Sequence, residues 1–224
     1  MIFEITVQGG SSVRLPTSGK YCDRDIVVTA TGGGGSDTQF KDFCEGALTD
    51  VYDESITKLR TSAFRDATQL KSVRLPNVTS IGGNAFRDCS NLEVIDLPQA
   101  TGFTGTYSFS GCGKLTQVNV TGFTALSNYA FQNCSSLARI ELGNLGSIGA
   151  GAFSGCSSLE TVIIRKVGTS ATPLPVTNAF TNTPIASGTG YIYVPASAVD
   201  AFKVAKNWAT YAAQIRAIED YPEI

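Results

Sequence analysis

The sequence predicts a repeat solenoid, mainly β with short helical turns, in which successive coils of the chain stack along one axis. The first observation is a phenylalanine that recurs at intervals of 22, 23, 22 and 22 residues, at Phe64, Phe86, Phe109, Phe131 and Phe153. The second is a small residue three positions after each phenylalanine and a leucine six positions after it. The third is a pair of aliphatic residues nine and eleven positions after it. A fixed interval of this length is the sequence signature of stacked supersecondary units.

Each unit is predicted to contain one strand on its aliphatic pair. In the first unit Val73 and Leu75 are expected to point inward while Arg74 points outward, because side chains alternate between the two faces of a strand. The segment Ala-Phe-x-x-Cys is too short for a helix of its own and suits a single helical turn, with Phe and Cys on one inward face. One such unit cannot bury both of its sides, so each coil must use its neighbour as a core.

Four of the six cysteines occupy one register of the repeat: Cys89, Cys112, Cys134 and Cys156. Stacking places them in a column about 4.8 Å apart, with parallel Cβ directions that resist the torsion of a disulfide bond. Ala67 and Thr183 stand in the same register, which indicates a requirement for small size rather than thiol chemistry. We therefore expect reduced, buried thiols. The alternative is a thiolate metal ladder, which would need convergent side chains.

The repeats are predicted to span residues 56–194, as five clear units and a degenerate sixth. After Ile164 the register loosens, since the next phenylalanine, Phe180, comes 27 residues after the last one. We expect the insert Val167–Thr177 to form a loop and Tyr191–Val194 to form the last strand. An atypical terminal unit is typical of solenoids, because the outermost coil has no neighbour on one side.

Residues 195–224 are predicted to form a helical C-terminal cap. Pro195 opens a stretch whose apolar residues recur at intervals of three or four: Val199, Phe202, Ala205, Trp208, Ala212, Ile215 and Ile218. This spacing predicts one apolar helical stripe, with a break near Asn207 that would divide it into two short helices. We interpret the stripe as the surface that covers the last coil. The alternative is an amphipathic helix that binds a partner.

Residues 1–31 are predicted to form a small β attachment module. Its strands are expected at Ile2–Val7, Ser12–Leu15 and Asp25–Thr31. About 30 residues are too few for a self-sufficient core, so we expect this module to dock on another surface. A Gly-rich linker follows over residues 32–37. Residues 38–55 are expected to form the N-terminal cap of the solenoid, with a helix at Thr38–Glu45.

The pattern Ile-Gly-x-x-Ala-Phe-x-x-Cys-x-x-Leu-x-x-Ile-x-Leu-Pro, clearest at Ile81–Pro98, resembles the BspA-type leucine-rich repeat. The resemblance covers residues 56–164 and, with the end segment, most of the chain to residue 218. It implies a leucine-rich-repeat fold and an adhesion or recognition role in bacterial or phage-related surface proteins. The chain departs from the broader leucine-rich pattern in having no regular asparagine ladder. The shorter segment Gly19–Val28 resembles segments in tail-associated proteins of phages and prophages.

The composition disfavours an enzyme. The chain contains no histidine, which excludes Ser-His-Asp and Cys-His nucleophile systems and every metal site that needs histidine. Lys and Arg total 17 against 19 Asp and Glu, so no positive excess favours nucleic acid. No apolar run is long enough for a membrane-spanning helix. We therefore predict no catalytic residue, no cofactor, no metal, no nucleic-acid partner and no membrane insertion.

The candidate binding surface is the outward column of the strand face: Arg74, Asp96, Asn119, Glu141 and Ile163. Repeat folds bind along extended faces through exposed positions that are free to vary. Arg65 and Arg87 follow their phenylalanines and add positive charge to the early coils, where we expect any anionic partner to bind. The alternative is a solvated face on which neighbours such as Arg74 and Asp96 pair across strands.

These features predict a non-enzymatic binding or adhesion protein, and specifically a phage or prophage tail-associated structural protein that presents its repeats for host recognition. Its expected partners are other virion proteins through residues 1–31 and a cell-surface protein or glycan through the solenoid. Homo-oligomerisation through the N-terminal module is left open. The expected location is the virion, assembled in the bacterial cytoplasm, because the first residues alternate like a strand and show no secretory signal pattern.

Two alternatives come from other classes of protein. The first is a fragment of a BspA-type bacterial surface adhesin that binds host protein or glycan at the cell surface. The second is a hydrolase of cell-surface glycans with Asp96 and Glu141 as its carboxylates. Strands two rungs apart separate these two backbones by about 9–10 Å, at or beyond the upper end of inverting geometry, and no cleft is predicted there.

Overall fold

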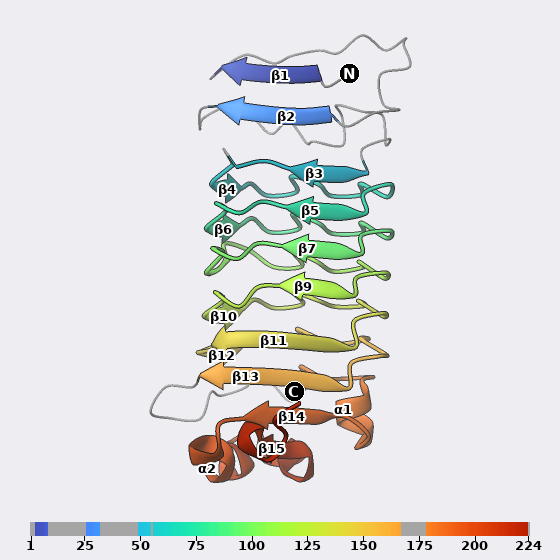
Figure 1. Ribbon diagram of the computed structural model, residues 1–224. Coiled ribbons are helices and arrows are strands. Elements are labelled where there is room, and N and C mark those ends of the chain that lie inside the picture. The colour runs from blue at the N-terminus through green and yellow to red at the C-terminus, as the bar shows by residue number, and fades with distance from the viewer. Residues whose placement is uncertain (1–2, 9–25, 32–48, 55, 167–177, 224) are drawn as a thin grey trace.

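The computed structural model describes residues 3–8, 26–31, 49–54, 56–166 and 178–223. Its elements follow one another along a single axis, from the N-terminal strands at one end to the C-terminal helices at the other (Figure 1). Every strand pair is parallel, and in the regular coils the paired residues lie one repeat apart, as in Val51 with Val73 and Val73 with Ile95. The predicted leucine-rich-repeat solenoid is confirmed, and the structure adds that its strands are parallel.

The strands of the aliphatic pairs form two four-stranded parallel sheets in line, together called the main sheet, which faces the viewer in Figure 1. Its first part contains β3 (Asp50–Tyr52), β5 (Ser72–Arg74), β7 (Val94–Asp96) and β9 (Gln117–Asn119). Its second part contains β11 (Arg139–Asn144), β13 (Thr161–Lys166), β14 (Tyr191–Val194) and β15 (Ile215–Ala217). One side of this sheet covers the core, and the other side forms an extended outer face.

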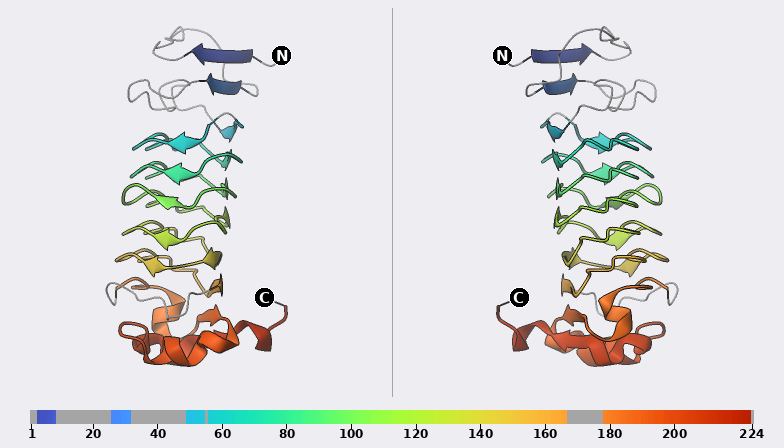
Figure 2. Two further views of the ribbon diagram at one scale, coloured as in Figure 1. Left: turned by 90° about the vertical axis from the view of Figure 1, so that its left-hand side faces the viewer. Right: turned by 90° about the vertical axis from the view of Figure 1, so that its right-hand side faces the viewer.

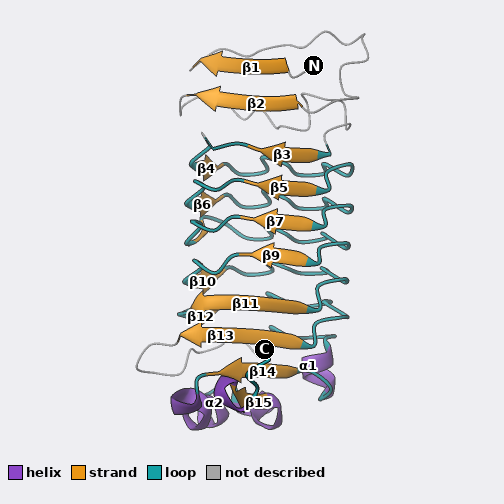
Figure 3. Cartoon of the chain, in the orientation of Figure 1, coloured by secondary structure: helices purple, strands orange, loops and turns teal. Residues whose placement is uncertain are grey.

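A second set of short strands lies along one side of the stack and leads away from the main sheet (Figure 2). These are β4 (Lys58–Leu59), β6 (Ser80–Ile81), β8 (Gly102–Phe103), β10 (Ala125–Leu126) and β12 (Ser147–Ile148). Their second residues are aliphatic in four of five coils and are buried there, which explains the apolar residue five positions before each of those phenylalanines. Each coil therefore has three sides: a main strand, a minor strand and a turn (Figure 3).

The segment predicted as one helical turn is a pair of hydrogen-bonded turns. Within a coil, the Ala67 N–H donates to the Phe64 carbonyl oxygen at 3.1 Å. Between coils, the Phe64 N–H donates to the Ala85 carbonyl oxygen at 2.6 Å, and the Asp66 N–H donates to that of Arg87 at 2.8 Å. Alternate N–H groups therefore bond to the neighbouring coil, which an α-helix would not allow because its N–H groups bond within the helix.

Positive φ angles on both sides of the phenylalanine produce this backbone path. Two residues after it, φ lies between 59° and 79° at Asp66, Asp88, Gly111, Asn133, Gly155 and Asn182. Two residues before it, φ lies between 56° and 61° at Ser62, Asn84, Tyr107, Tyr129 and Gly151. Gly, Asn and Asp are the residue types that enter this left-handed region most readily. Ser62 and the two tyrosines are exceptions, and the tyrosines form part of a surface described below.

The phenylalanines form a continuous stack inside the solenoid. From Phe64 to Phe180, successive ring centroids lie 5.0–5.7 Å apart and the rings are within 9° of parallel. All six side chains are fully buried. Tyr211 closes the stack with an edge-on contact to Phe180, at a centroid distance of 5.3 Å. Because full burial of one phenylalanine stabilises by about 1.5–3 kcal/mol, this stack is a main source of cohesion between coils.

Threonine takes the place of the asparagine ladder that the repeat lacks. The Thr79 hydroxyl donates to the Thr57 carbonyl oxygen at 3.1 Å, the Thr101 hydroxyl to that of Thr79 at 3.2 Å, and the Thr124 hydroxyl to that of Thr101 at 3.1 Å. The backbone N–H groups of the same threonines donate to the same carbonyl oxygens. This column therefore joins four coils at the corner between the main and minor strands.

The C-terminal region is only partly helical. The α-helix α2 (Val199–Val204) and a 3-10 helix at Ala209–Gln214 flank the expected break, where Asn207 has φ 72°. The prediction of helix is wrong at β15, which pairs in parallel with β14 and places Ile215 beside Ile192. This interval of 23 residues continues the repeat, so the apolar residue Ile215 belongs to the strand column. Phe202 and Trp208 are fully buried beside each other, with ring centroids 4.6 Å apart.

The two N-terminal strands follow the interval of the coils. β1 (Phe3–Gln8) and β2 (Ile26–Thr31) pair in parallel with Phe3 opposite Ile26, an interval of 23 residues. The expected strand Ser12–Leu15, the linker 32–37 and the helix Thr38–Glu45 lie outside the described residues. β3, in the range expected to form a cap, is a strand of the main sheet.

Glycine is required where neighbouring coils approach most closely. A Cβ atom at Gly149 would lie 2.4 Å from two backbone atoms of the preceding coil, the nitrogen of Asn128 and the carbonyl carbon of Ser127. A Cβ atom at Gly102, in a minor strand of another coil, would meet no atom within 4 Å. These two glycines form a matched pair, because they differ mainly in the space that a methyl group would find.

We expect Gly149→Ala to lower the free energy of unfolding by about 1–3 kcal/mol, because the new methyl group must push two coils apart. Gly102→Ala should change it by less than about 1 kcal/mol, since the site is open and alanine restricts the unfolded chain. Urea unfolding followed by circular dichroism measures both values. Equal stability of the two variants would show that the spacing between coils is not constrained by Gly149.

Candidate binding surface

The structure brings the predicted outward column together on adjacent strands of the main sheet. Arg74 pairs in register with Asp96, and Asp96 with Asn119, across β5, β7 and β9. Glu141 pairs with Ile163 across β11 and β13. The same register also contains three residues that the sequence analysis missed: Tyr52, Tyr193 and Arg216. The aliphatic alternation that located Arg74 would have found Tyr52 next to Val51.

Two polar side chains of this column bond to each other, since the Asn119 amide donates to a carboxylate oxygen of Asp96 at 2.7 Å. Two positions earlier on the same strands, the Ser72 hydroxyl donates to Asp50. Within the described part of the chain, no ion pair joins Arg74 to Asp96, so the cross-strand pairing considered from the sequence is not observed. Arg74 is exposed, and its guanidinium is therefore available to a partner.

Glu141 is held by two arginines. Its carboxylate accepts hydrogen bonds from Arg165 at 2.8 and 3.3 Å and from Arg139 at 3.4 Å. The hydrogen bonds from Arg165 are the largest cause that lowers the pKa of Glu141, and the charges of both arginines act in the same direction. A carboxyl group with a lowered pKa is a poor general acid at neutral pH, so Glu141 is unsuited to the general-acid role in the hydrolase considered from the sequence.

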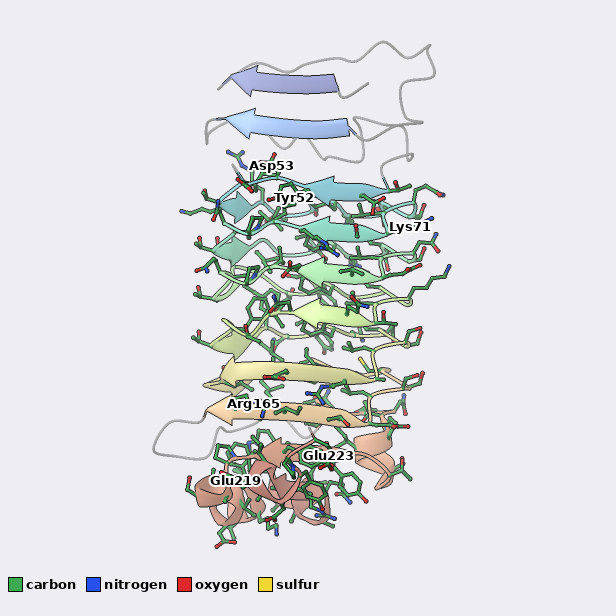
Figure 4. The ribbon with its side chains drawn as sticks, viewed as in Figure 1. Tyr52, Asp53, Lys71, Arg165, Glu219 and Glu223 are labelled. Atoms are coloured by element: carbon green, nitrogen blue, oxygen red, sulfur yellow. The ribbon has the colours of Figure 1, made fainter. Side chains whose placement is uncertain are left out.

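The outer face closes at its C-terminal end. Ile163 is fully buried, so its prediction as an exposed binding residue is wrong. Tyr193 beside it is 6% exposed, and the Tyr221 ring packs edge-on against the Tyr193 ring at 5.2 Å. The C-terminal segment lies in front of β13 and β14 in two views (Figures 1 and 2), and Figure 4 shows Arg165, Glu219 and Glu223 at this end. The sequence column alone could not show that the chain returns over its own sheet.

Arg65 and Arg87 lie on the turns that follow the minor strands β4 and β6, and not on the main strands. The structure therefore does not bring them together with Arg74 and the rest of the strand column. Each lies beside the carboxylate that follows it, Arg65 with Asp66 at 3.5 Å and Arg87 with Asp88 at 3.3 Å. Their positive charge is locally offset, which weakens the case for an anionic partner at the early coils.

The turn side carries a second cluster that the sequence analysis missed. The rings of Tyr107 and Tyr129 stack with centroids 4.7 Å apart and an interplanar angle of 7°, and the Arg87 guanidinium lies 5.3 Å from the Tyr107 centroid. We call Arg87, Tyr107 and Tyr129 the tyrosine ridge. A Cβ atom at Gly151 would lie 2.5 Å from the Tyr129 ring, so the ring covers this glycine.

The tyrosine ridge gains little stability from its own contacts. A non-glycine residue in the left-handed region costs about 1–2 kcal/mol, and the ridge contains two. An aromatic pair stabilises by about 0.5–1.5 kcal/mol and an exposed cation–π contact by about 0.5–1 kcal/mol. The stabilisation from these contacts therefore nearly cancels the backbone cost of the two tyrosines. Asn84 and Gly151 occupy the same register in other coils at lower backbone cost, so stability alone does not account for the tyrosines.

The four aligned cysteines are buried thiols. Each Sγ atom donates to the phenylalanine carbonyl oxygen of the preceding coil, as in Cys89 to Phe64 at 2.9 Å and Cys112 to Phe86 at 3.1 Å. Burial raises the pKa of Cys89 to about 12 and raises that of Cys112 and Cys134 well above the ordinary value. Among the described residues, no group of three or more His, Cys, Asp or Glu side chains is placed to hold a metal ion.

The comparisons with known proteins agree with this geometry. The family described as BspA type Leucine rich repeat region matches residues 53–186 in six copies, which is more than half of the chain. The chain belongs to the BspA-type leucine-rich repeat family. The six copies correspond in number to five regular units and one degenerate unit. No curated protein matches this BspA-type chain. No helix in its described part is long and apolar enough to cross a membrane.

One solved structure shows the same fold, and two others are similar to parts of the chain. A leucine rich cell surface protein from Faecalibacterium prausnitzii A2-165 is 23% identical with a TM-score of 0.50, covering 73% of this chain and 43% of that one. A leucine rich repeat protein of T. pallidum is 26% identical with a TM-score of 0.45, covering 55% and 57%. One from Bacteroides ovatus ATCC 8483 is 19% identical with a TM-score of 0.43, covering 69% and 53%. The BspA-type chain thus spans about half the length of these structures.

We expect the four aligned thiols to resist modification in the folded protein, because full burial denies a reagent access to all four. The raised pKa of Cys89, Cys112 and Cys134 also suppresses their thiolate forms. A Cys22→Ser/Cys44→Ser variant leaves only these four cysteines to titrate. Ellman's reagent at pH 8 should report almost no fast thiol in the native variant and four after addition of guanidinium chloride. Fast modification of all four in native protein would contradict the buried ladder.

We expect the contribution of Glu141 to stability to depend on pH. Its folded pKa is lowered, so the contribution is complete above the unfolded value of about 4.3 and is lost as pH falls through the folded value. Because the carboxylate is partly exposed and solvent screens its ion pairs, Glu141→Gln should cost only about 0.2–1 kcal/mol at pH 7. The variant and the wild type should converge at acid pH in urea unfolding. Glu93→Gln, which breaks no ion pair of the described residues, is the control.

Proposed function

We propose that this BspA-type protein is a non-enzymatic binding or adhesion protein that acts at a cell surface. The observation that carries the proposal is the open strand face, the outward side of β3 to β9. Its exposed residues include Tyr52, which is 53% exposed, Arg74 and Gln117. The inward side of the same strands is completed by the core, so these side chains are not needed for folding and are available for recognition. A cell-surface protein or a glycan is the partner class we propose.

The cell-surface location has closer support than the virion location expected from the sequence. A protein with this fold from Faecalibacterium prausnitzii A2-165 is a leucine rich cell surface protein. The tail-associated hypothesis depends on the local resemblance of Gly19–Val28 and on attachment through residues 1–31. It therefore stays as the second candidate. Antibody labelling of intact bacteria and of purified phage particles from the same culture separates the two: label on cells supports the adhesin, and label on particles supports the tail protein.

We expect Arg74→Ala/Gln117→Ala to weaken binding of the purified protein to intact cells by about tenfold or more, because exposed arginines are often hot spots of recognition surfaces. Binding is measured with fluorescently labelled protein on bacterial and epithelial cells. Lys114→Ala, an exposed residue outside the strands, is the matched control and should bind like the wild type. Protease or periodate treatment of the cells then identifies a protein or a glycan partner. Unchanged binding of the double variant contradicts this role for the open strand face.

A further inference from the structure

We propose that the tyrosine ridge is a second binding surface, separate from the open strand face, and that it docks an uncharged loop of a partner protein through the backbone carbonyl oxygens of that loop. The ridge lies on the turns rather than on the main sheet, and it joins three successive coils. This inference does not depend on the proposed role of the strand face.

Both tyrosines of the ridge have a backbone conformation that is unusual for a bulky residue. Tyr107 and Tyr129 have φ angles of 61° and 58°, in a register where the other coils have Ser62, Asn84 and Gly151. A bulky side chain in this region is an outlier, and such strain is concentrated at functional sites. Two adjacent coils contain the same outlier, and the ridge contacts do no more than offset it. A role outside folding therefore accounts for both tyrosines at once.

The hydroxyl groups of both tyrosines are available at the surface of the ridge. Both tyrosine side chains are half-buried, and neither hydroxyl has a hydrogen-bond partner among the described residues. Neither hydroxyl is among the buried polar atoms that lack a partner, so both reach the surface. The ridge therefore presents two free phenol groups held at a fixed spacing by the stack. Tyrosine immobilised in this way offers a large contact area with little loss of side-chain entropy on binding.

The covered ring faces identify the class of partner. Arg87 covers one face of Tyr107, Tyr129 covers the other, and Gly151 lies under the outer face of Tyr129. These neighbours occupy much of the ring faces on which a sugar or a nucleobase would stack. The ring edges and hydroxyls remain, and aromatic edges carry partial positive charge that attracts oxygen atoms. Polypeptide carbonyl oxygens fit this pattern of donors.

The neighbouring charges indicate that the loop is uncharged. Asp88 lies 3.3 Å from the Arg87 guanidinium and offsets its charge. A carboxylate on the partner would approach Asp88 as well as Arg87, and like charges repel. Backbone carbonyl oxygens accept from the tyrosine hydroxyls without this repulsion. Tyrosine and arginine are also the residue types that most often dominate the binding energy of protein interfaces.

The test uses a library of displayed random short peptides with the full chain as bait. Recovered peptides are then measured against three variants: Tyr107→Asn/Tyr129→Asn, Tyr107→Phe/Tyr129→Phe and Val204→Asn. We expect about tenfold or greater loss of affinity with the Asn pair, because the ridge is removed. The Phe pair keeps the stack but removes the hydroxyls, so a smaller loss is expected. Val204→Asn introduces asparagine at a 79% exposed position of α2, outside both proposed surfaces, and should leave affinity unchanged.

Thermal unfolding of each variant distinguishes a loss of binding from a loss of the fold. Asparagine tolerates positive φ, so the Asn pair should melt at or above the wild-type temperature. The proposal is overturned if no peptide is recovered, if the peptides bind the Asn pair as tightly as the wild type, or if the Asn pair is strongly destabilised. Failure of the cell-binding experiment with Arg74→Ala/Gln117→Ala would affect the strand face alone, so the two proposals fail separately.

Discussion

The structure depends on one constraint: no coil can bury its own phenylalanine. From Phe86 to Phe153, each ring is covered by the rings of the coils before and after it, at 5.0–5.7 Å, and the other inward columns recur at the same residue interval. The turns bond alternately within and between coils, the threonines bond to the preceding coil, and the thiols do the same. Polar and apolar contacts thus share a single interval, and cohesion comes from neighbours rather than from one central core.

The inward half of this arrangement could be predicted from the sequence because burial restricts residue type. Phe, Leu, Cys and the aliphatic pairs recur at fixed positions, and all but one of these residues are buried or nearly so. The prediction from periodicity is wrong at the C-terminal end of the repeats. Ile215 was assigned to a helix because its spacing from Trp208 and Ala212 fits a helical stripe, whereas its partner in space is Ile192 of β14. Ile215 fits both the spacing of three or four residues in a helix and the interval of 23 residues in the repeat.

The outward half could be predicted only as a list of positions. The strand alternation located Arg74, Asp96, Asn119 and Glu141 on one face, but it could not show that the C-terminal segment returns to bury Ile163. The tyrosine ridge was missed for a different reason. Its signal is a backbone angle, and two tyrosines among Ser, Asn and Gly show nothing unusual until the register is known to require positive φ. Surface chemistry therefore needed the three-dimensional path of the chain.

The stacking direction also determines how the molecule would respond to being pulled. The first described strand, β1, and the C-terminal helices lie at opposite ends of the stack, so tension between them acts along the axis and across the strands (Figure 1). Such a load would separate the hydrogen-bonded strands one after another, and would not shear the whole sheet at once. Each released coil would lengthen the tether by one unit while the others hold. A protein anchored at one end and attached at the other would thus behave as a stepwise extensible spring.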